Sequence, residues 1–202
     1  MARRGDALRE HILWAAKDVF LELGFERASM DIVAARATTS KRSLYAHFES
    51  KDRLFLAVVE LVRGLYLDGL KTPDAYGHDD AEAVVRYCGR FLQILLYGPA
   101  LRACRLFIAE ADRHPEASAL YHEAIFEVPH GRLAAFLRDR YGLSQAASDE
   151  IANELLGRTI YPRLVRALLG LEELLASSPG EESIADDVDL EPIRQAVHAL
   201  LR

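Results

Sequence analysis

The chain has 202 residues, half of them hydrophobic, which is enough to bury the core of one or two compact domains. Its formal net charge is −6, but residues 1–53 carry a formal +2 and residues 54–202 a formal −8. The negative charge is therefore not spread evenly along the chain. This asymmetry favours a polyanionic partner for the N-terminal end alone.

Targeting and redox signals are sparse. The sequence has no apolar run of ~18 residues that could span a membrane, and Arg3 and Arg4 are not followed by the apolar segment of a signal peptide. Cys88 and Cys104 are too few for a disulfide framework. We therefore expect a cytoplasmic protein that has no membrane partner and keeps its thiols reduced.

The first predicted helix stops at Gly24, and its apolar residues fall on one face at a 3.6-residue period. Trp14, the single tryptophan, lies off that face, so it should be at least partly exposed. The apolar face consists of Ile12, Ala16, Val19, Phe20 and Leu23.

Two short helices and a long one follow. Ser29 is expected to cap a helix that runs to Arg36, and after a tight connection at 37–39 a second short helix spans Ser40–His47. Ser50 should cap the long helix. Two short helices joined by a tight turn and braced by an earlier helix form a helix-turn-helix, whose second helix enters the major groove of DNA.

The second short helix carries side chains suited to DNA. Lys41 and Arg42 occupy its first turn, from which they can reach base edges, and arginine to guanine is the commonest specific contact. Lys51 lies in the first turn of the long helix, where backbone N–H groups and the helix dipole favour a phosphate. One alternative stays open, in which Tyr45 is a half-buried core residue and Lys51 an ordinary solvated lysine. The candidate DNA-binding residues are Ser29, Thr39, Ser40, Lys41, Arg42, Ser43, Tyr45, His47 and Lys51.

Farther along the chain, apolar residues recur at helical spacing beyond a predicted loop at 71–80. Pro99 should lie in the first turn of a helix that ends at Pro115, Pro129 should kink the next helix, and Pro162 should interrupt a helix at 148–170. An acidic loop at 174–189 precedes a last amphipathic helix at 189–201. No segment alternates with period two.

The predicted fold class is therefore all-α. We expect an N-terminal domain at 1–52, a three-helix head with the helix-turn-helix, and a larger helical bundle at 53–202 that binds a ligand and dimerises.

The residue order in the head adds a family resemblance. Residues 12–59 closely resemble the DNA-binding head of the TetR family of bacterial transcriptional regulators, over roughly a quarter of the chain. The resemblance implies a homodimeric, ligand-responsive regulator of a two-fold symmetric DNA operator, usually a repressor, with Ser29, Tyr45, His47 and Lys51 holding phosphates. It rests on Ala15, Ala16, Phe20, Gly24, Phe25, Ser29, Ser40, Lys41, Leu44, Tyr45, His47, Phe48 and Lys51.

Two positions depart from the family pattern. Thr38 stands where the family usually has glycine, and a left-handed backbone is costly for a β-branched residue. Either the turn closes differently or Thr38 is strained. Arg42 stands at another position where the family often has glycine, so base preference cannot be carried over from relatives.

The C-terminal region resembles the family less. Residues 105–126 are similar to the C-terminal domain of an AefR-like subgroup, which implies a helical effector pocket and a dimer interface built from the last two long helices. The pattern of residues agrees with this interface, because the helices at 148–170 and 189–201 have enough apolar positions to bury one face in the core and another against a second copy. We expect a second copy to cover the stripe Leu190, Ile193, Val197 and Leu201.

Aromatic residues beside isolated polar ones suggest where a small molecule could bind. A buried Glu110 would need a partner, which Arg105 or Arg113 could supply. The alternative, which is favoured for each residue taken singly, is an ordinary core residue. The candidate ligand-binding residues are Tyr87, Phe91, Phe107, Glu110, Tyr121 and Ile125.

Other classes of function have little support in the sequence. Glu123, Glu127 and His130 share a helical face, but no cysteine or second close histidine completes a metal site, so no metal or cofactor is expected. No Ser-His-Asp order, glycine-rich phosphate loop or Cys-x-x-Cys pair indicates an enzyme. The alternative to a DNA-binding regulator is a TetR-like small-molecule binding protein with weak or lost DNA recognition, for which Thr38 is the warning sign.

Overall fold

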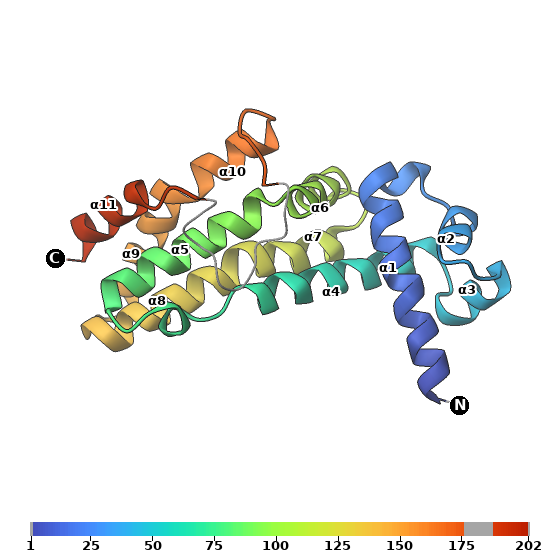
Figure 1. Ribbon diagram of the computed structural model, residues 1–202, viewed down its shortest axis with the longest axis horizontal. Coiled ribbons are helices and arrows are strands. Elements are labelled where there is room, and N and C mark those ends of the chain that lie inside the picture. Colours follow the sequence, from blue (N-terminus) through green and yellow to red (C-terminus); the bar gives the residue numbers. More distant parts are fainter. Residues whose placement is uncertain (1, 176–187, 202) are drawn as a thin grey trace. The chain divides into compact units, whose positions relative to one another are not determined.

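The computed structural model describes residues 2–175 and 188–201, with side chains from Gly5 onward, and these residues contain no β-strand (Figure 1). The all-α prediction is therefore confirmed. No helix in these ranges is long and apolar enough to cross a lipid bilayer. The α-helices are α1 Ala2–Arg27, α2 Met30–Arg36, α3 Lys41–His47, α4 Lys51–Gly69, α5 Asp80–Leu96, α6 Gly98–Ala109, α7 Pro115–His122, α8 Val128–Tyr141, α9 Gln145–Thr159, α10 Tyr161–Leu168 and α11 Glu191–Leu200.

The chain packs as two compact units. Residues 1–65 and 102–121 form one, here called the head unit, and residues 66–101 and 122–202 form the other, the body unit. The division therefore falls within α4 and α6 rather than after residue 52, because the first part of α4 and residues 102–121 pack with the first three helices. It stays a prediction that residues 1–52 bind DNA and that residues 53–202 bind a ligand and dimerise.

Aromatic rings form the centre of the head unit. Phe20 and Phe25 lie on either side of Gly24, whose φ of 75° and ψ of 170° break the helical course of α1 as the sequence predicts. The ring of Phe55 on α4 lies 5.3 Å from Phe20 and 5.0 Å from Phe25 between centroids. Phe107 lies 5.8 Å from Phe55. These contacts explain why residues 102–121 belong to this unit.

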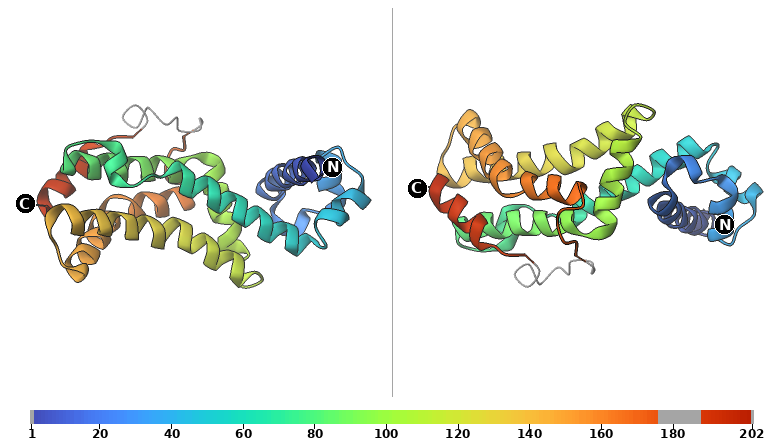
Figure 2. Two further views of the ribbon diagram at one scale, coloured as in Figure 1. Left: turned by 90° about the horizontal axis from the view of Figure 1, so that it is seen from below. Right: turned by 90° about the horizontal axis from the view of Figure 1, so that it is seen from above.

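The body unit is built around α5. Its residues from Ala83 to Leu96 are buried except Arg86. Helix α8 packs along α9, and α11 lies against both α5 and α9 (Figures 1 and 2). Two arginines hold the C-terminal end of α4: Arg90 donates to the carbonyl of Gly69 at 3.0 Å, and Arg132 donates to that of Leu70. The unpaired carbonyls of a helix end are satisfied in this way.

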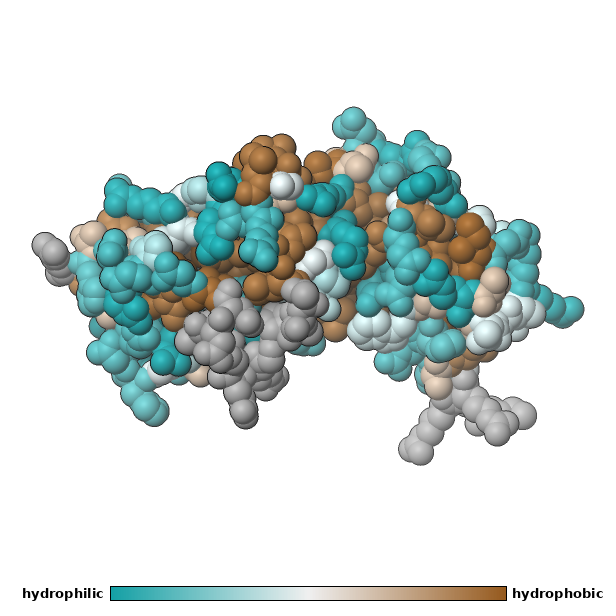
Figure 3. Space-filling view, turned by 45° about the horizontal axis from the view of Figure 1, so that its top comes forward, coloured by the Kyte–Doolittle hydropathy of each residue, from teal (hydrophilic) through white to brown (hydrophobic). Residues whose placement is uncertain are grey.

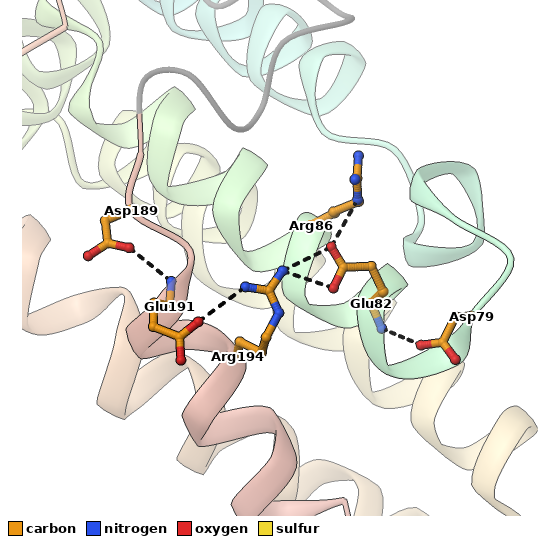
Figure 4. A network of polar contacts seen from close by, with 6 residues as sticks. All are labelled: Asp79, Glu82, Arg86, Asp189, Glu191 and Arg194. Carbon is orange, nitrogen blue, oxygen red and sulfur yellow. Dashed lines mark hydrogen bonds and ion pairs between the residues drawn. The ribbon is translucent and has the colours of Figure 1, made fainter.

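Charged side chains dock α11 onto the start of α5, as Figure 4 shows. Arg194 donates to both carboxylate oxygens of Glu82, at 3.2 and 3.0 Å, and Glu82 also accepts from Arg86 at 3.1 Å. Asp79 caps α5 by accepting from the backbone N–H of Glu82 at 2.8 Å. A network of this kind fixes the position of α11 more firmly than an isolated exposed pair would.

The last helix buries the two middle residues of its apolar stripe, and Leu190 and Leu201 at the ends of the stripe are half-exposed. Ile193 is 2% exposed and Val197 is fully buried within the single chain, where α11 meets α5 and α9. Burial inside the chain's own core means that a second copy does not cover Ile193 and Val197. The expectation is therefore wrong for Ile193 and Val197, because periodicity alone cannot tell an intrachain contact from an interchain one, and it stays a prediction for the half-exposed Leu190 and Leu201.

The prolines that the structure describes lie in the first turns of helices, but α6 ends at Ala109 and not at Pro115 as expected. Pro115 begins α7, and Pro162 lies in the first turn of α10, just after α9 ends. Before Pro129 the helix widens into a π-helical turn at Glu123–Glu127, since proline lacks an N–H to continue the α-helical bonding pattern. Most of the predicted loop at 174–189 lies outside the described residues.

Candidate nucleic-acid interface

Serine caps define the starts of the three helices in the predicted helix-turn-helix region. The hydroxyl of Ser29 accepts from the N–H of Ile32 at 3.2 Å, and that of Ser40 accepts from the N–H of Ser43 at 3.0 Å. Ser50 does the same for α4, at 3.1 Å from the N–H of Arg53. The capping predictions for Ser29 and Ser50 are confirmed, and Ser40, expected as the first residue of its helix, is the cap that precedes it. The hydroxyls of Ser29 and Ser50 each keep an O–H that can donate to a phosphate oxygen, whereas that of Ser40 shares a hydrogen bond with the Ser43 hydroxyl.

The turn between α2 and α3 closes with a Schellman motif. The N–H of Thr39 donates to the carbonyl of Ala34 at 3.0 Å, and the N–H of Thr38 donates to that of Ala35 at 3.1 Å. Thr38 has a φ of 47°, and no other non-glycine residue in the described ranges has a positive φ. The turn thus forms without glycine, and Thr38 is held in the left-handed conformation that β-branched residues avoid.

Helix α3 buries one side chain and exposes a polar face. Leu44 is fully buried and anchors α3 in the head unit. Lys41 and Arg42 in the first turn are exposed, and Tyr45, one turn further on, is 44% exposed. Tyr45 is therefore an exposed residue of α3 and not part of the core.

The remaining predicted residues of this region lie around the same helix. Ser43 and His47 are partly exposed on α3, and the hydroxyls of Ser40 and Ser43 lie 2.9 Å apart. Thr39 is partly exposed in the turn. The structure thus brings the predicted α3 and turn residues together on one short element.

Lys41 is already engaged in an ion pair. Its ammonium lies 2.7 Å from Oδ1 of Asp31 and 3.0 Å from Oδ2, which joins the first turns of α2 and α3. The hydrogen bond to Asp31 and the carboxylate's charge raise the pKa of Lys41. A second exposed pair links α1 to the end of α2, where Arg36 donates to both carboxylate oxygens of Glu22 at 3.0 and 2.7 Å.

Lys51 has a structural role that the sequence did not predict. Its ammonium donates to the carbonyls of Phe25 and Ala28 at 2.9 and 3.2 Å, and it lies 4.1 Å from the centre of the Phe25 ring. An ammonium has three donors, so two of these three are used to hold the end of α1 against α4. Lys51 is not an ordinary solvated lysine, and one donor is left for a phosphate.

The candidate ligand-binding residues are divided between the two units. Phe107, Glu110 and Tyr121 belong to the head unit, where the rings of Phe107 and Tyr121 lie 4.6 Å apart. Glu110 is 9% exposed and accepts from Arg113 at 3.4 Å, so Arg113 is a partner of this carboxylate, as expected. All three residues are buried.

The other three candidates, Tyr87, Phe91 and Ile125, are buried in the body unit. The hydroxyl of Tyr87 donates to the carbonyl of Pro129 at 2.7 Å, and burial raises the pKa of Tyr87 well above its ordinary value. The body unit also has a surface hollow of about 470 Å³, and none of the six candidates lines it. Its lining is Thr72, Asp74, Gly131, Arg132, Ala135, Phe136, Asp139 and Arg140.

The carboxylates and imidazole that share a helical face do not form a metal site. His130 contacts the backbone carbonyl of Asp149 at 3.2 Å, and Glu127 pairs with His122 at 3.3 Å. Within the described ranges, no group of three or more His, Cys, Asp and Glu side chains is arranged to hold a metal ion.

Comparison with known proteins identifies the head. Residues 12–58 match the family described as bacterial regulatory proteins, tetR family, and this range includes α2, α3 and the Schellman turn between them. The chain belongs to the TetR family.

Three curated relatives illustrate the similarity. The chain is 46% identical over 63 residues to the transcriptional activator FasR of Mycolicibacterium smegmatis, a match that covers 29% of each protein. It is 30% identical over 139 residues to the repressor NicS of Pseudomonas putida, covering 68% of this chain and 58% of NicS. It is 32% identical over 111 residues to the regulator RutR of Escherichia coli K12, covering 54% of this chain and 50% of RutR. The chain thus spans less than two thirds of the length of each relative.

Solved structures share the fold of this protein over nearly its whole length. A TetR-family regulator from Mesorhizobium loti has a TM-score of 0.76 at 22% identity, and 98% of this chain aligns with 96% of that one. The flavonoid-responsive regulator FrrA has a TM-score of 0.70 at 25% identity, with 97% and 94% covered.

Two contributions to this TetR-family head escaped prediction. Asp31 is ten residues from Lys41 and pairs with it only because the Schellman turn folds α3 back beside α2. Lys51 is 26 residues from Phe25, whose carbonyl it binds. Spacing within one helix carries no signal for either contact.

Proposed function

We propose that this protein is a ligand-responsive DNA-binding transcriptional regulator that recognises a two-fold symmetric operator as a homodimer. The observation that carries the proposal is the exposed first turn of α3, with Lys41 and Arg42 held at a Schellman turn inside a TetR-family head. The relatives named above are activators, repressors or regulators, and none is named as an enzyme. More specifically, we propose that the protein represses transcription and that a small-molecule effector releases it from the operator.

The DNA-binding part is tested without knowledge of the natural operator. The protein is used to select duplexes from a random-sequence pool, and the enriched duplex is then titrated in a gel-shift assay. We expect enrichment of a two-fold symmetric site whose half-sites lie about one or two helical turns apart. No enrichment in low salt would overturn the proposal and favour a small-molecule binding protein without DNA recognition.

A different surface from the α11 stripe is proposed for the dimer. Val165 on α10 is 53% exposed, and Leu169 and Leu171 just beyond it are 69% and 60% exposed. Figure 3 shows apolar surface on the face of the molecule that includes this region. Exposed apolar side chains in a cluster mark interaction surfaces. A second copy placed here would use residues 148–170, one of the two segments that the family resemblance implies.

Sedimentation measurements test the dimer surface. Val165→Glu should give monomer, because a carboxylate in an apolar interface is costly unless it is paired. Ile108→Glu is the matched control, since Ile108 is 60% exposed but lies on α6. An intact dimer in Val165→Glu, or a monomer in both variants, would place the interface elsewhere.

The effector part of the proposal rests on buried aromatic side chains. Phe91→Ala and Tyr121→Ala should weaken the effector and leave DNA affinity in its absence unchanged. Trp14 is 37% exposed on α1, as predicted, and its emission can report on the head unit during an effector titration. Effector affinity equal to wild type in both variants would exclude these residues. Tight effector binding without any change in operator affinity would exclude allosteric control, because coupling is reciprocal.

A further inference from the structure

The acidic residue on the predicted DNA-binding surface invites a functional explanation. Asp31 lies in the first turn of α2, two residues after the Ser29 cap, and its side chain is 67% exposed. A carboxylate facing DNA phosphates is repelled by them, whereas Lys41 beside it is attracted. The two oxygens of Asp31 lie 2.7 and 3.0 Å from the ammonium of Lys41, so the pair presents little net charge.

We propose that Asp31 is a selectivity-determining residue, which positions Lys41 for base contact and suppresses binding to DNA of the wrong sequence. The inference rests on the proposed DNA-binding function. It assigns to Asp31 an effect on the ratio of operator to non-operator affinity, not on affinity alone.

The number of donors on an ammonium explains why the effect depends on sequence. Lys41 has three N–H donors, so it can keep its bond to Asp31 while it donates to the O6 and N7 acceptors of guanine in the major groove. In that complex Asp31 orients the amine. When the head lies on the phosphate backbone of a non-operator duplex, no base edge is engaged and Lys41 serves only as a cation. Asp31 then cancels most of that attraction.

The pair is suited to such a role because it is exposed. Exposed ion pairs contribute little to stability, so the bond can be rearranged on DNA at small cost. The Arg36–Glu22 pair is also exposed, although somewhat less, and it joins α1 to the last turn of α2 and not to the first turn of α3. It therefore provides a matched control with the same change in charge.

The test compares Asp31→Asn, Glu22→Gln and wild type on the selected operator and on a scrambled duplex of equal length, at several salt concentrations. Asp31→Asn should raise affinity for the scrambled duplex by about tenfold and for the operator by much less. It should steepen the salt dependence on the scrambled duplex by about 0.9 per head. Glu22→Gln should change the ratio of the two affinities less than twofold.

A double-mutant cycle tests whether Asp31 acts through Lys41. In a Lys41→Gln background, Asp31→Asn should lose most of its effect on the affinity ratio, and Asp31→Glu alone should keep wild-type selectivity. An equal gain for Asp31→Asn and Glu22→Gln would show an effect of net charge only and overturn the proposal. So would an unchanged ratio in Asp31→Asn with normal folding by circular dichroism. If wild type selects no duplex, it is the proposed function that fails.

Discussion

Thr38 shows how a single backbone angle can be maintained against the preference of its residue. The two hydrogen bonds of the Schellman motif and the burial of Ala37 hold the turn, and Thr38 takes a φ of 47° to close it. A left-handed conformation costs a residue with a β-carbon about 1–2 kcal/mol. The head unit tolerates this cost because α2 and α3 are fixed on both sides by capping serines and buried apolar residues.

The first prediction concerns this strain. Thr38→Gly should raise the free energy of unfolding by about 0.5–1 kcal/mol, since relief of the strain exceeds the entropy that glycine adds to the unfolded chain. Urea denaturation measures the change. Thr38→Ala keeps the β-carbon and should gain less than the glycine variant. A loss of stability in Thr38→Gly would mean that the Thr38 side chain makes a stabilising contact.

A second prediction separates base reading from affinity. Arg42→Ala should relax base preference at one position per half-site and cost about 1–3 kcal/mol on the selected operator, because Arg42 is exposed in the first turn of α3. Affinities on a panel of singly substituted operators measure this. An equal loss on all duplexes would make Arg42 a phosphate contact instead.

Lys51 gives the third prediction. Lys51→Met should lower the free energy of unfolding by about 1–3 kcal/mol, because the carbonyls of Phe25 and Ala28 lose a charged donor in a partly buried position. Arg53→Met, on the exposed side of the same helix, should change it by less than about 0.5 kcal/mol. Equal stability in the two variants would leave Lys51 with a role in DNA binding only. Any DNA-binding defect of Lys51→Met should be measured well below its unfolding temperature.

At the scale of elements, the described helices are held by partners distant in sequence. Helix α11 is a short amphipathic helix, and its stability comes from the buried contacts of Ile193 and Val197 and from the Arg194–Glu82 pair. Helix α4 is held at one end by Lys51 and at the other by Arg90 and Arg132. These contacts give each helix a fixed position that its own sequence would not.

The fourth prediction follows from the burial of α11. Val197→Glu should lower the free energy of unfolding by at least about 3 kcal/mol at any protein concentration, since an unpaired carboxylate would enter the core beside α5 and α9. Ala199→Glu, on the exposed side of α11, is the control and should have little effect. A folded monomer in Val197→Glu would restore α11 as the dimer surface.

At the scale of the whole molecule, the two units share helices. The division between units falls within α4 and within α6, so neither unit is a separate segment of the chain. Each unit contains one buried cysteine, Cys104 in the head unit and Cys88 in the body unit. Burial raises the pKa of Cys88 to about 12. The pKa of Cys104 is raised to about 11, and burial is the largest cause. Both thiols are therefore neutral and shielded near pH 8.

The fifth prediction uses these thiols as reporters. A thiol reagent at pH 8 should modify neither cysteine in the native protein, and both should become reactive over one urea transition because α4 and α6 continue through both units. Single variants Cys88→Ala and Cys104→Ala assign the signals. Modification of Cys104 at lower urea than Cys88 would show that the head unit opens independently.

The same shifts give a pH dependence. A thiol whose pKa is raised on folding contributes stability that is complete below the unfolded pKa of ~8.5 and is lost as pH rises through the folded value. Stability should thus fall between about pH 9 and pH 12, and less steeply in Cys88→Ala.

Local sequence determined most of the secondary structure of this protein. Local signals specify where helices begin and end and which of their faces are apolar, because these signals act within about four residues. The signals are the capping serines at positions 29, 40 and 50, the break at Gly24, the prolines and the apolar period. The order of residues in the head was also sufficient to indicate the family. The candidate effector residues and the boundary at residue 52 were read from the same local patterns and stay predictions.

Tertiary structure decided what each face and each charge contacts. Only the packed chain shows that Val197 is buried against its own α5 and α9, that Lys51 binds the end of α1, and that Asp31 pairs with Lys41. An apolar stripe has the same period whether it packs against its own chain or against a second copy. The sequence also does not show whether a lysine contacts a carbonyl, a carboxylate or a phosphate. Contacts across 10 to 26 residues depend on how the turns direct the helices, which is a property of the whole fold.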